Sequence, residues 1–394
     1  MTNKTLTYLY ILWAISIPFS LWLMQIFLGI IFLYTIILAV KEKQIPFKAH
    51  PVFIFWSIYL VLGLLSAILS PDALRSLKVF INVEWTLLSV PILSSLALSS
   101  QDAKKILNAL IISGSIVSVY AIYQFLTGVD IILGNELGSL GNYYRAVGLY
   151  NFYLTFAGNQ LMIYFICFIY FINEKKWNRN KYLYLAAMIL LISSLYATYA
   201  RSTWLALFAV LIVGSILHDK KLILKIIIPI IIVSVLLLIF IPDLNTRFLS
   251  IFDMSQNEGR LNLWSTSVKL IKDHIWHGIG PAYFPEMAEK YKVPGFYDTM
   301  AHAHNDALHI AVLNGIPAAL AWIGMWILWL YWMIKRIYSL SFSQGQRQSL
   351  FGIAMSIASI LIAGFFQCYY FDLENNILWM FLVIISFRIK SNED

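Results

Sequence analysis

Long apolar runs, separated by short polar segments, dominate the pattern of this sequence. Twelve of these runs are long enough to cross a bilayer, which takes roughly 17–25 apolar residues per helix. The runs fall at 7–22, 23–40, 52–70, 79–97, 104–126, 152–172, 182–199, 202–218, 222–241, 306–334, 349–366 and 372–389. The pattern predicts an all-α integral membrane protein with about 12 transmembrane helices.

Composition supports the same class of protein. Hydrophobic residues make up 60% of the chain and charged residues 12%, whereas a soluble domain usually has about 25% charged residues. The net charge of +8 does not indicate nucleic acid, because the basic residues lie in short segments between apolar runs. Cys167 and Cys368 lie in or beside apolar runs, so we interpret them as core residues and not as a disulfide or metal framework.

The basic residues also predict an orientation. With a cytoplasmic N-terminus, the inside segments hold 18 of the 28 lysines and arginines. Six of the other ten lie in the long segment 242–305, where the positive-inside rule is weak. We therefore expect a multi-pass protein with both termini in the cytoplasm.

Two of the outside segments are more than simple turns. Segment 127–151 is polar and rich in glycine, and segment 242–305 has about 64 residues, a length that usually has a functional reason. Within the second, residues 260–274 carry apolar side chains at helical spacing, which predicts a small, partly helical cap on the membrane. The chain thus divides into transmembrane helices one to nine (1–241), a large outside loop (242–305) and the last three helices (306–394).

Three arginines lie on the predicted outer face. Ser202 or Thr203 could cap the helix that begins beside Arg201, and an arginine at a helix N-terminus is suited to a phosphate. An interfacial arginine that reaches lipid headgroups is the alternative interpretation. Arg260 could equally be a loop charge paired with Glu258. Arg145, flanked by tyrosines, could steer an anionic substrate or stack on its neighbours.

The histidines gather near one helix start. Five of the seven lie in the large loop or just after it: His274, His277, His302, His304 and His309. Asn305 or Asp306 is a good N-cap, so His304 lies at the mouth of the next helix. The helix dipole disfavours imidazolium there, whereas Asp306 acts in the opposite direction. A neutral, oriented histidine is a good general base near neutral pH.

A metal site is a rival interpretation of the same histidines. His302 and His304, together with Asp306 or His309, have suitable ligand types. However, no H-E-x-x-H or other ligand spacing with a defined mechanism is present. Histidines scattered at an interface are a third interpretation. We expect no metal.

Three motif regions, in this order, make the chain resemble the O-antigen ligase and O-antigen polymerase superfamily. The first is an arginine-serine element at a helix start, Arg201-Ser202. The second is Gly259-Arg260 with Trp264, followed by the turn His277-Gly278-Ile279-Gly280. The third is His304-Asn305, then nine residues, then Gly315-Ile316-Pro317-Ala318, where the ligases usually have glycine, threonine or valine in place of this alanine. The resemblance covers the whole length of the chain.

The resemblance implies a GT-C-like membrane glycosyltransferase that needs no metal or other cofactor. Such enzymes take a glycan from undecaprenyl diphosphate on the periplasmic face of the bacterial inner membrane. Ligases transfer it to the lipid A–core oligosaccharide, and polymerases to another lipid-linked repeat unit. The expected partners are therefore this donor, a glycan acceptor and membrane lipids, with no nucleic acid.

The residue roles that follow concern one face of the membrane. Arg201 and Arg260 are expected to bind the diphosphate and His304 to act as the catalytic base. Arg145 is a further candidate for donor binding, and Ser202, Asn305 and Gly315 are expected to support the site.

A transporter of a lipid-linked or anionic substrate is the alternative from another class of protein. Transporters tend to have two similar halves and charged or broken helices at the bilayer midplane. In this chain the two halves look unlike and the charges of interest lie at the outer rim, which favours an enzyme.

Overall fold

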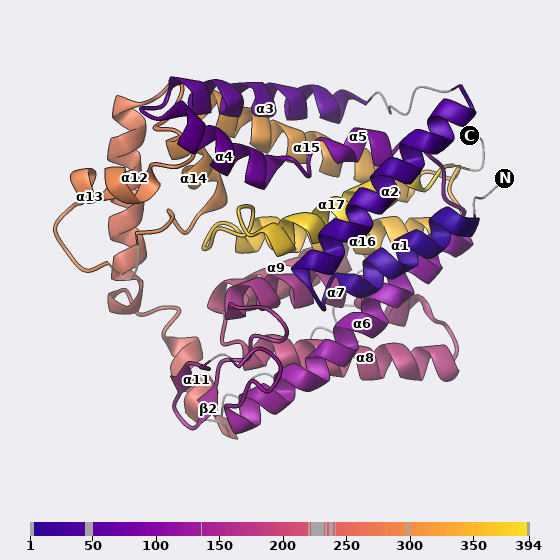
Figure 1. The fold of residues 1–394 in the computed structure, drawn as a ribbon. Helices are drawn as coiled ribbons and strands as arrows, with labels where there is room; N and C mark the ends of the chain where they lie inside the picture. The colour runs from indigo at the N-terminus through magenta and orange to yellow at the C-terminus, as the bar shows by residue number, and fades with distance from the viewer. Residues whose placement is uncertain are drawn as a thin grey trace. The chain divides into compact units, whose positions relative to one another are not determined.

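The computed structural model describes residues 4–43, 50–134, 136–219, 221, 232, 235, 239–240, 242–297 and 300–391. This part of the chain is mostly helical (Figure 1). Two short strands, β1 (Ser139–Leu140) and β2 (Tyr143–Tyr144), pair antiparallel. The helices are α1 (Lys4–Ser16), α2 (Leu21–Lys41), α3 (Pro51–Leu69), α4 (Ala73–Glu84), α5 (Ser89–Leu93), α6 (Ser100–Thr127), α7 (Tyr153–Asn173), α8 (Arg179–Ala197), α9 (Arg201–His218), α11 (Pro242–Leu249), α12 (Glu258–Asp273), α13 (Phe284–Tyr291), α14 (Asp306–Asn314), α15 (Ile316–Tyr338), α16 (Gln344–Ala363) and α17 (Leu373–Arg388).

Eight segments of the described chain are long and apolar enough to cross a membrane. They are α2, α3, the segment Ala73–Leu93 that holds α4 and α5, α6, α7, α8, α9 and α15. Each of them overlaps one predicted span, so the chain is a multi-pass membrane protein. The predicted spans 7–22, 349–366 and 372–389 correspond to α1, α16 and α17, which are not among the eight, and 222–241 lies mostly outside the described residues. The count of 12 stays a prediction.

The contacts divide the chain into two compact units, each built from separate stretches of sequence. The first comprises Met1–Ile31, Leu98–Asp253 and Ser343–Ala363. The second comprises Phe32–Ala97, Met254–Phe342 and Gly364–Asp394. The division into 1–241, 242–305 and 306–394 concerns membrane topology and stays a prediction.

In the first unit, α7 is the most deeply buried of the candidate spanning helices, and α6, α8, α9 and α16 all pack against it. Small residues allow these helices to approach closely, as is common in membranes. A Cβ on Gly352 of α16 would lie 3.3 Å from the Cα of Ile166 on α7. The hydroxyl of Ser356 donates a hydrogen bond to the carbonyl of Met162 at 2.6 Å, so a polar contact joins the same two helices.

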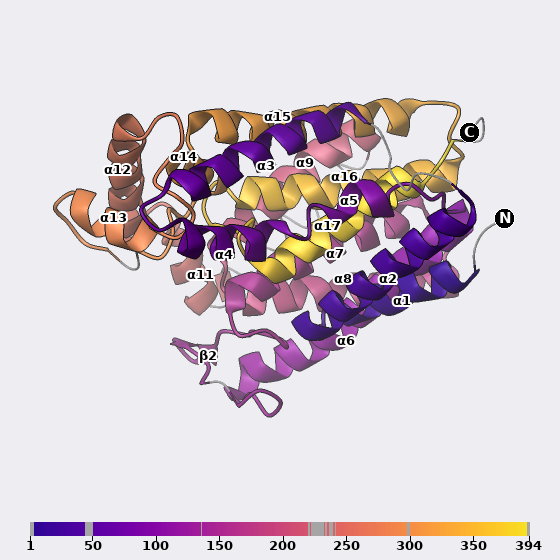
Figure 2. The ribbon, with the colours of Figure 1, turned by 45° about the horizontal axis from the view of Figure 1, so that its top comes forward.

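In the second unit, α3 packs along α15 and against α14, as both ribbon views show (Figures 1 and 2). A buried carboxylate lies inside this unit. Glu84 accepts hydrogen bonds from the hydroxyls of Tyr59, at 2.6 Å, and Tyr370, at 2.8 Å. A charged or polar group in such surroundings is costly unless it is hydrogen-bonded, and these two tyrosines supply the partners.

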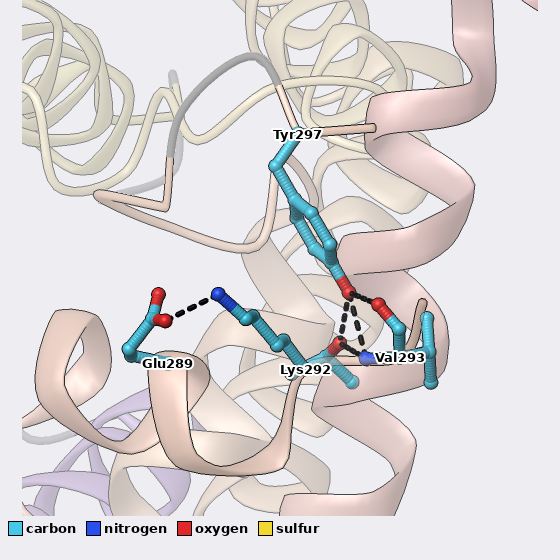
Figure 3. A network of polar contacts seen from close by, with 5 residues as sticks. Glu289, Lys292, Val293 and Tyr297 are labelled. Atoms are coloured by element: carbon cyan, nitrogen blue, oxygen red, sulfur yellow. Dashed lines mark hydrogen bonds and ion pairs between the residues drawn. The ribbon is translucent and has the colours of Figure 1, made fainter. Parts of the chain in front are cut away.

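The segment after residue 254 forms a small cap with its own apolar core. The helix predicted in 260–274 is confirmed as α12, and its Leu263 and Leu270 are buried in that core together with Phe284 of α13. Figure 3 shows how the following loop is closed by a tyrosine. The hydroxyl of Tyr297 bonds to both the N–H and the carbonyl of Val293, at 2.8 Å each. Apolar packing and these hydrogen bonds therefore both hold the described part of the cap together.

Candidate functional site

His304 lies in the loop before α14 and has a left-handed backbone, with φ of +49°. This conformation costs a non-glycine residue on the order of 1–3 kcal/mol, so its surroundings must hold it in place. Asn305 provides part of that hold. Its side chain accepts a hydrogen bond from the N–H of Leu308 at 2.9 Å and donates one to the carbonyl of Phe365 at 3.1 Å. The prediction of Asn305 or Asp306 as the N-cap of this helix is confirmed for Asn305.

The imidazole of His304 is buried and oriented by a glutamine. Its Nδ1 lies 2.5 Å from Oε1 of Gln367, a residue that is itself buried. An amide oxygen only accepts hydrogen bonds, so Nδ1 carries the proton and Nε2 keeps its lone pair in the neutral ring. This tautomer is the one that a general base acting through Nε2 requires. Sequence analysis missed Gln367, because no motif marks it and it lies 63 residues further along the chain.

Asp306 fixes the other side of this loop. Its N–H donates to the carbonyl of Gly364 at 2.8 Å, and its carboxylate accepts from the N–H of Tyr370 at 2.9 Å. The segment 364–370 thus contacts three consecutive residues: His304 through Gln367, Asn305 through Phe365, and Asp306. The start of α14 and this segment form one hydrogen-bonded corner.

A second histidine lies against the first. The ring centroids of His302 and His304 are 4.3 Å apart, and Nδ1 of His302 accepts a hydrogen bond from the N–H of His304 at 3.4 Å. Burial lowers the pKa of His302 to about 3, with smaller contributions from His304 and from the charge of Arg260. His302 is therefore neutral at physiological pH. Arg260 lies in the first turn of α12, in the same unit as His302.

We find no metal-binding group in the described ranges. No three His, Cys, Asp or Glu side chains there are arranged to hold an ion. His304 instead bonds to the side-chain amide of Gln367, and His302 contacts the ring and backbone of His304. His309 packs between Phe284 and Phe371, with centroids 4.7 and 4.8 Å away.

Two of the motif regions meet through their backbones. The N–H of Ile279 donates to the carbonyl of Val312 at 2.9 Å, and the N–H of Ile316 donates to that of Ile275 at 2.8 Å. Glycine is needed on both sides. A Cβ on Gly278 would lie 2.3 Å from the oxygen of Leu313, and one on Gly315 would lie 2.4 Å from the oxygen of Trp276. The His-Gly-x-Gly turn and the Gly315 region therefore form one packed unit behind α14.

The prediction of one helix over 306–334 was wrong. The segment divides at Gly315, whose φ is +86°, into α14 and the longer α15. Pro317, near the start of α15, lacks the N–H that an uninterrupted helix would use. Because both halves are apolar, the hydrophobic pattern did not reveal the break.

In the first unit, Arg201 is the first residue of α9, but the predicted cap was wrong. The N-cap position is Ala200, which makes no side-chain cap. Ser202 is buried within the first turn, and Thr203 donates to the carbonyl of Ala200 at 2.8 Å. The tight turn explains the difference, because Tyr199 has a left-handed φ of +54° and the hydroxyl of Thr198 accepts from the N–H of Ala200 at 3.2 Å.

Ser250, the residue directly after α11, orients Arg201. The Nη1 of Arg201 donates to the carbonyl of Ser250 at 2.6 Å and contacts its hydroxyl at 3.2 Å. From α11 itself, Nε of Arg247 donates to the carbonyl of Tyr199 at 3.3 Å. Arg247 is a second cation at the α8–α9 turn that sequence analysis did not select, because α11 lies at the edge of the large loop and nothing marked it as a neighbour of Arg201.

Arg145 belongs to the same neighbourhood of the first unit. The N–H of Ala146 donates to the carbonyl of Ala197 at 3.0 Å, which joins this segment to the end of α8. The guanidinium lies 4.5 Å from the ring centroid of Tyr153 in α7, whereas the sequence-based interpretation was stacking on the tyrosines that flank Arg145. Its Nε is buried without a hydrogen-bond partner among the described residues. An anionic ligand could satisfy this donor.

The candidate residues thus form two groups. Arg145, Arg201 and Ser202 belong to the first unit, and Arg260, His304, Asn305 and Gly315 belong to the second. The family model described as O-antigen ligase matches residues 186–323, a range that holds every one of these residues except Arg145. No curated protein matches the chain.

Proposed function

We propose, on the premise that the chain belongs to the O-antigen ligase superfamily, that it is a membrane glycosyltransferase. It moves a glycan from undecaprenyl diphosphate to a hydroxyl of the lipid A–core oligosaccharide. The reaction takes place on the periplasmic face of the bacterial inner membrane, needs no metal and inverts the anomeric configuration. A second lipid-linked repeat unit as acceptor would make the same enzyme a polysaccharide polymerase.

The observation that carries this proposal is the hydrogen bond between Nδ1 of His304 and Gln367. It leaves Nε2 as the basic nitrogen, which takes the proton of the acceptor hydroxyl. The hydroxyl oxygen then bonds to the anomeric carbon as the bond from that carbon to the diphosphate oxygen breaks. The proton ends on His304 and the negative charge ends on the departing lipid diphosphate. General-base catalysis of this kind typically increases the rate of the reaction by roughly 10²–10⁴-fold.

Arg201 and Arg260 bind the diphosphate in this proposal. A guanidinium matches phosphate oxygens in charge and geometry, and a hydrogen bond to a charged group contributes about 1.5–3 kcal/mol. The growing charge of the leaving group strengthens these bonds in the transition state. The contact with Ser250 supports the role of Arg201, because it holds the guanidinium in one orientation. The unsatisfied Nε of Arg145 supports a further role in holding the donor.

The other three residues have supporting roles. Asn305 caps α14 beside the base, Gly315 allows the close backbone contact behind it, and Ser202 packs in the first turn of α9. None of the three needs to contact substrate.

The test is transfer by purified protein from undecaprenyl-diphosphate glycan, with lipid A–core or a second donor as the acceptor. We expect product with one of them, no change with EDTA, and a loss of about 10²–10⁴ in rate for His304→Ala. His218→Ala is the matched control, since this histidine lies at the last residue of α9 and bonds to Asn173 instead. Full activity of His304→Ala, or EDTA inhibition reversed by Zn²⁺ or Mg²⁺, would overturn the proposal.

A further inference from the structure

A long apolar groove lies between α6 and α8 of the first unit. The two helices pack side by side in both ribbon views (Figures 1 and 2). The groove has a volume of about 550 Å³, within the range of roughly 300–1,000 Å³ typical of ligand pockets. Its lining runs from Asn108 to Val119 on α6 and from Asn180 to Leu190 on α8.

The length of the groove matches the depth of one membrane leaflet. At 1.5 Å per residue, each of these two helix segments is about 15 Å long. Half of a hydrocarbon core about 30 Å thick is also about 15 Å. Ile112 and Ile116 line the groove and are more than half exposed, so the groove opens outward from a pair of candidate spanning helices. A slot with these dimensions fits an extended alkyl chain that enters from one membrane surface.

One end of the groove is polar. Asn180 is the second residue of α8, and the hydroxyl of Tyr184 donates to Oδ1 of Asn108 across the gap at 3.0 Å. The remaining lining is almost entirely aliphatic. The groove therefore has a headgroup end at the start of α8 and a tail end deeper along both helices.

Basic residues lie in the stretches of chain that lead into this end of the two helices. Six lie in the first two turns of α6 and α8 or just before α8: Lys104, Lys105, Lys175, Lys176, Arg179 and Lys181. The acidic residues in the same stretches are Asp102 and Glu174, so positive charge is in excess. The charge pattern of the sequence assigns all six to the cytoplasmic side, opposite the predicted diphosphate site.

We propose that this groove binds an anionic phospholipid of the cytoplasmic leaflet, with one acyl chain between α6 and α8 and the phosphate among the basic residues. Each lysine or arginine near an anionic headgroup contributes about 1 kcal/mol, or about fivefold in affinity. The groove alone would accept any lipid tail. The charge excess is what favours an anionic lipid over a zwitterionic one.

The experiment uses the purified full chain in detergent, with equimolar phosphatidylglycerol and phosphatidylcholine as probes and native mass spectrometry as readout. We expect preferential retention of phosphatidylglycerol. Ile116→Trp fills the groove and should lower retention of both lipids. Ile189→Trp is the matched control, because Ile189 lies on α8, is exposed to a similar extent (55% against 56%) and does not line the groove.

A second pair of variants keeps the test decisive if the tryptophan disturbs folding. Arg179→Gln with Lys181→Gln removes two charges at the polar end and should reduce the preference for phosphatidylglycerol by about 25-fold. Lys335→Gln, at the end of α15 in the second unit, should leave it unchanged. Equal retention of the two lipids, equal behaviour of Ile116→Trp and Ile189→Trp, or preferential retention of undecaprenyl phosphate would overturn the proposal. Glycan transfer is not part of the readout, so this result is independent of the proposed function.

Discussion

Gln367 is a positioning residue that acts on His304 through one hydrogen bond. We predict that two substitutions of Gln367 have different effects on the rate of transfer. Gln367→Leu removes the acceptor for Nδ1 of His304, so the ring loses its fixed tautomer and transfer should fall about tenfold or more. Gln367→Glu keeps an acceptor and adds a negative charge, which raises the pKa of an imidazole. The acid limb of the pH–rate profile should therefore move to higher pH, while the rate at alkaline pH recovers.

The same pair of variants separates positioning from packing. If Gln367 only filled space, both variants would lower kcat to a similar extent and the pH profile would keep its shape. Such an outcome would contradict the assignment of Nε2 as the base.

The lowered pKa of His302 leads to a prediction of how the folding stability depends on pH. Its pKa is lowered to about 3 in the fold, mainly by burial, against about 6.5 for an unperturbed histidine. Between these two values the unfolded chain binds one proton more than the folded chain. Stability should therefore be complete above about pH 6.5 and fall as the pH drops toward 3, by at most about 1.4 kcal/mol per pH unit.

Thermal unfolding in detergent at pH 7 and pH 5 measures this effect. His302→Asn replaces the imidazole by a group that does not titrate, so its melting temperature should fall less over this interval than that of the parent chain. An identical fall in both proteins would show that other groups dominate the acid response.

At the scale of elements, two glycines hold the His-Gly-x-Gly turn against the junction of α14 and α15. Gly278→Ala would place a Cβ 2.3 Å from a backbone oxygen, in addition to its left-handed φ of +68°. Gly134→Ala isolates the second effect, because Gly134 has φ of +71° and nothing within 4 Å of its added Cβ. We expect Gly134→Ala to lower the free energy of unfolding by about 1 kcal/mol or more. Gly278→Ala should lower it by a clearly larger amount.

Equilibrium unfolding of the two variants tests this prediction. If both variants lost the same free energy of unfolding, the turn at Gly278 could move away from Leu313 without a further loss of stability. Because Gly278 lies directly behind α14, Gly278→Ala should also lower transfer, whereas Gly134→Ala lies in the other unit and should leave the geometry of His304 intact.

The elements themselves could largely be predicted, because a helix in lipid must be a contiguous apolar run and an amphipathic helix shows its period. Eight predicted spans, α12 and the Asn305 cap all follow from such local signals. The division at Gly315 could not, since hydropathy does not report backbone angles. The capping error at Ser202 arose because the turn at Tyr199 determines where α9 begins.

The candidate site was harder to predict than the fold, for a physical reason. Arg201, Arg260 and His304 stand out locally as charged or titratable groups beside apolar runs. Gln367 and Arg247 act through neighbours that are distant in sequence: one orients His304 and the other lies at the Tyr199 carbonyl. Contacts of this kind depend on tertiary packing, and neither side chain is unusual in its own segment.

At the scale of the whole molecule, the proposed function assigns one diphosphate to two arginines from distant parts of the chain, Arg201 in α9 and Arg260 in α12. We predict that Arg201→Ala and Arg260→Ala each lower transfer about 10- to 100-fold, the equivalent of one charged hydrogen bond. If both guanidiniums bind the same leaving group, the double variant should lose less than the product of the two single effects, because residues that act on one group are not additive.

A double-mutant cycle therefore tests whether the two guanidiniums act on the same group. Initial rates with a fixed donor and acceptor give the coupling energy directly, and Arg347→Ala, near the start of α16, controls for the loss of a positive charge elsewhere. Strict additivity would mean that the two arginines act on different groups or in different steps. Only one of them would then hold the diphosphate, and the unsatisfied Nε of Arg145 would become the leading candidate for the second cation.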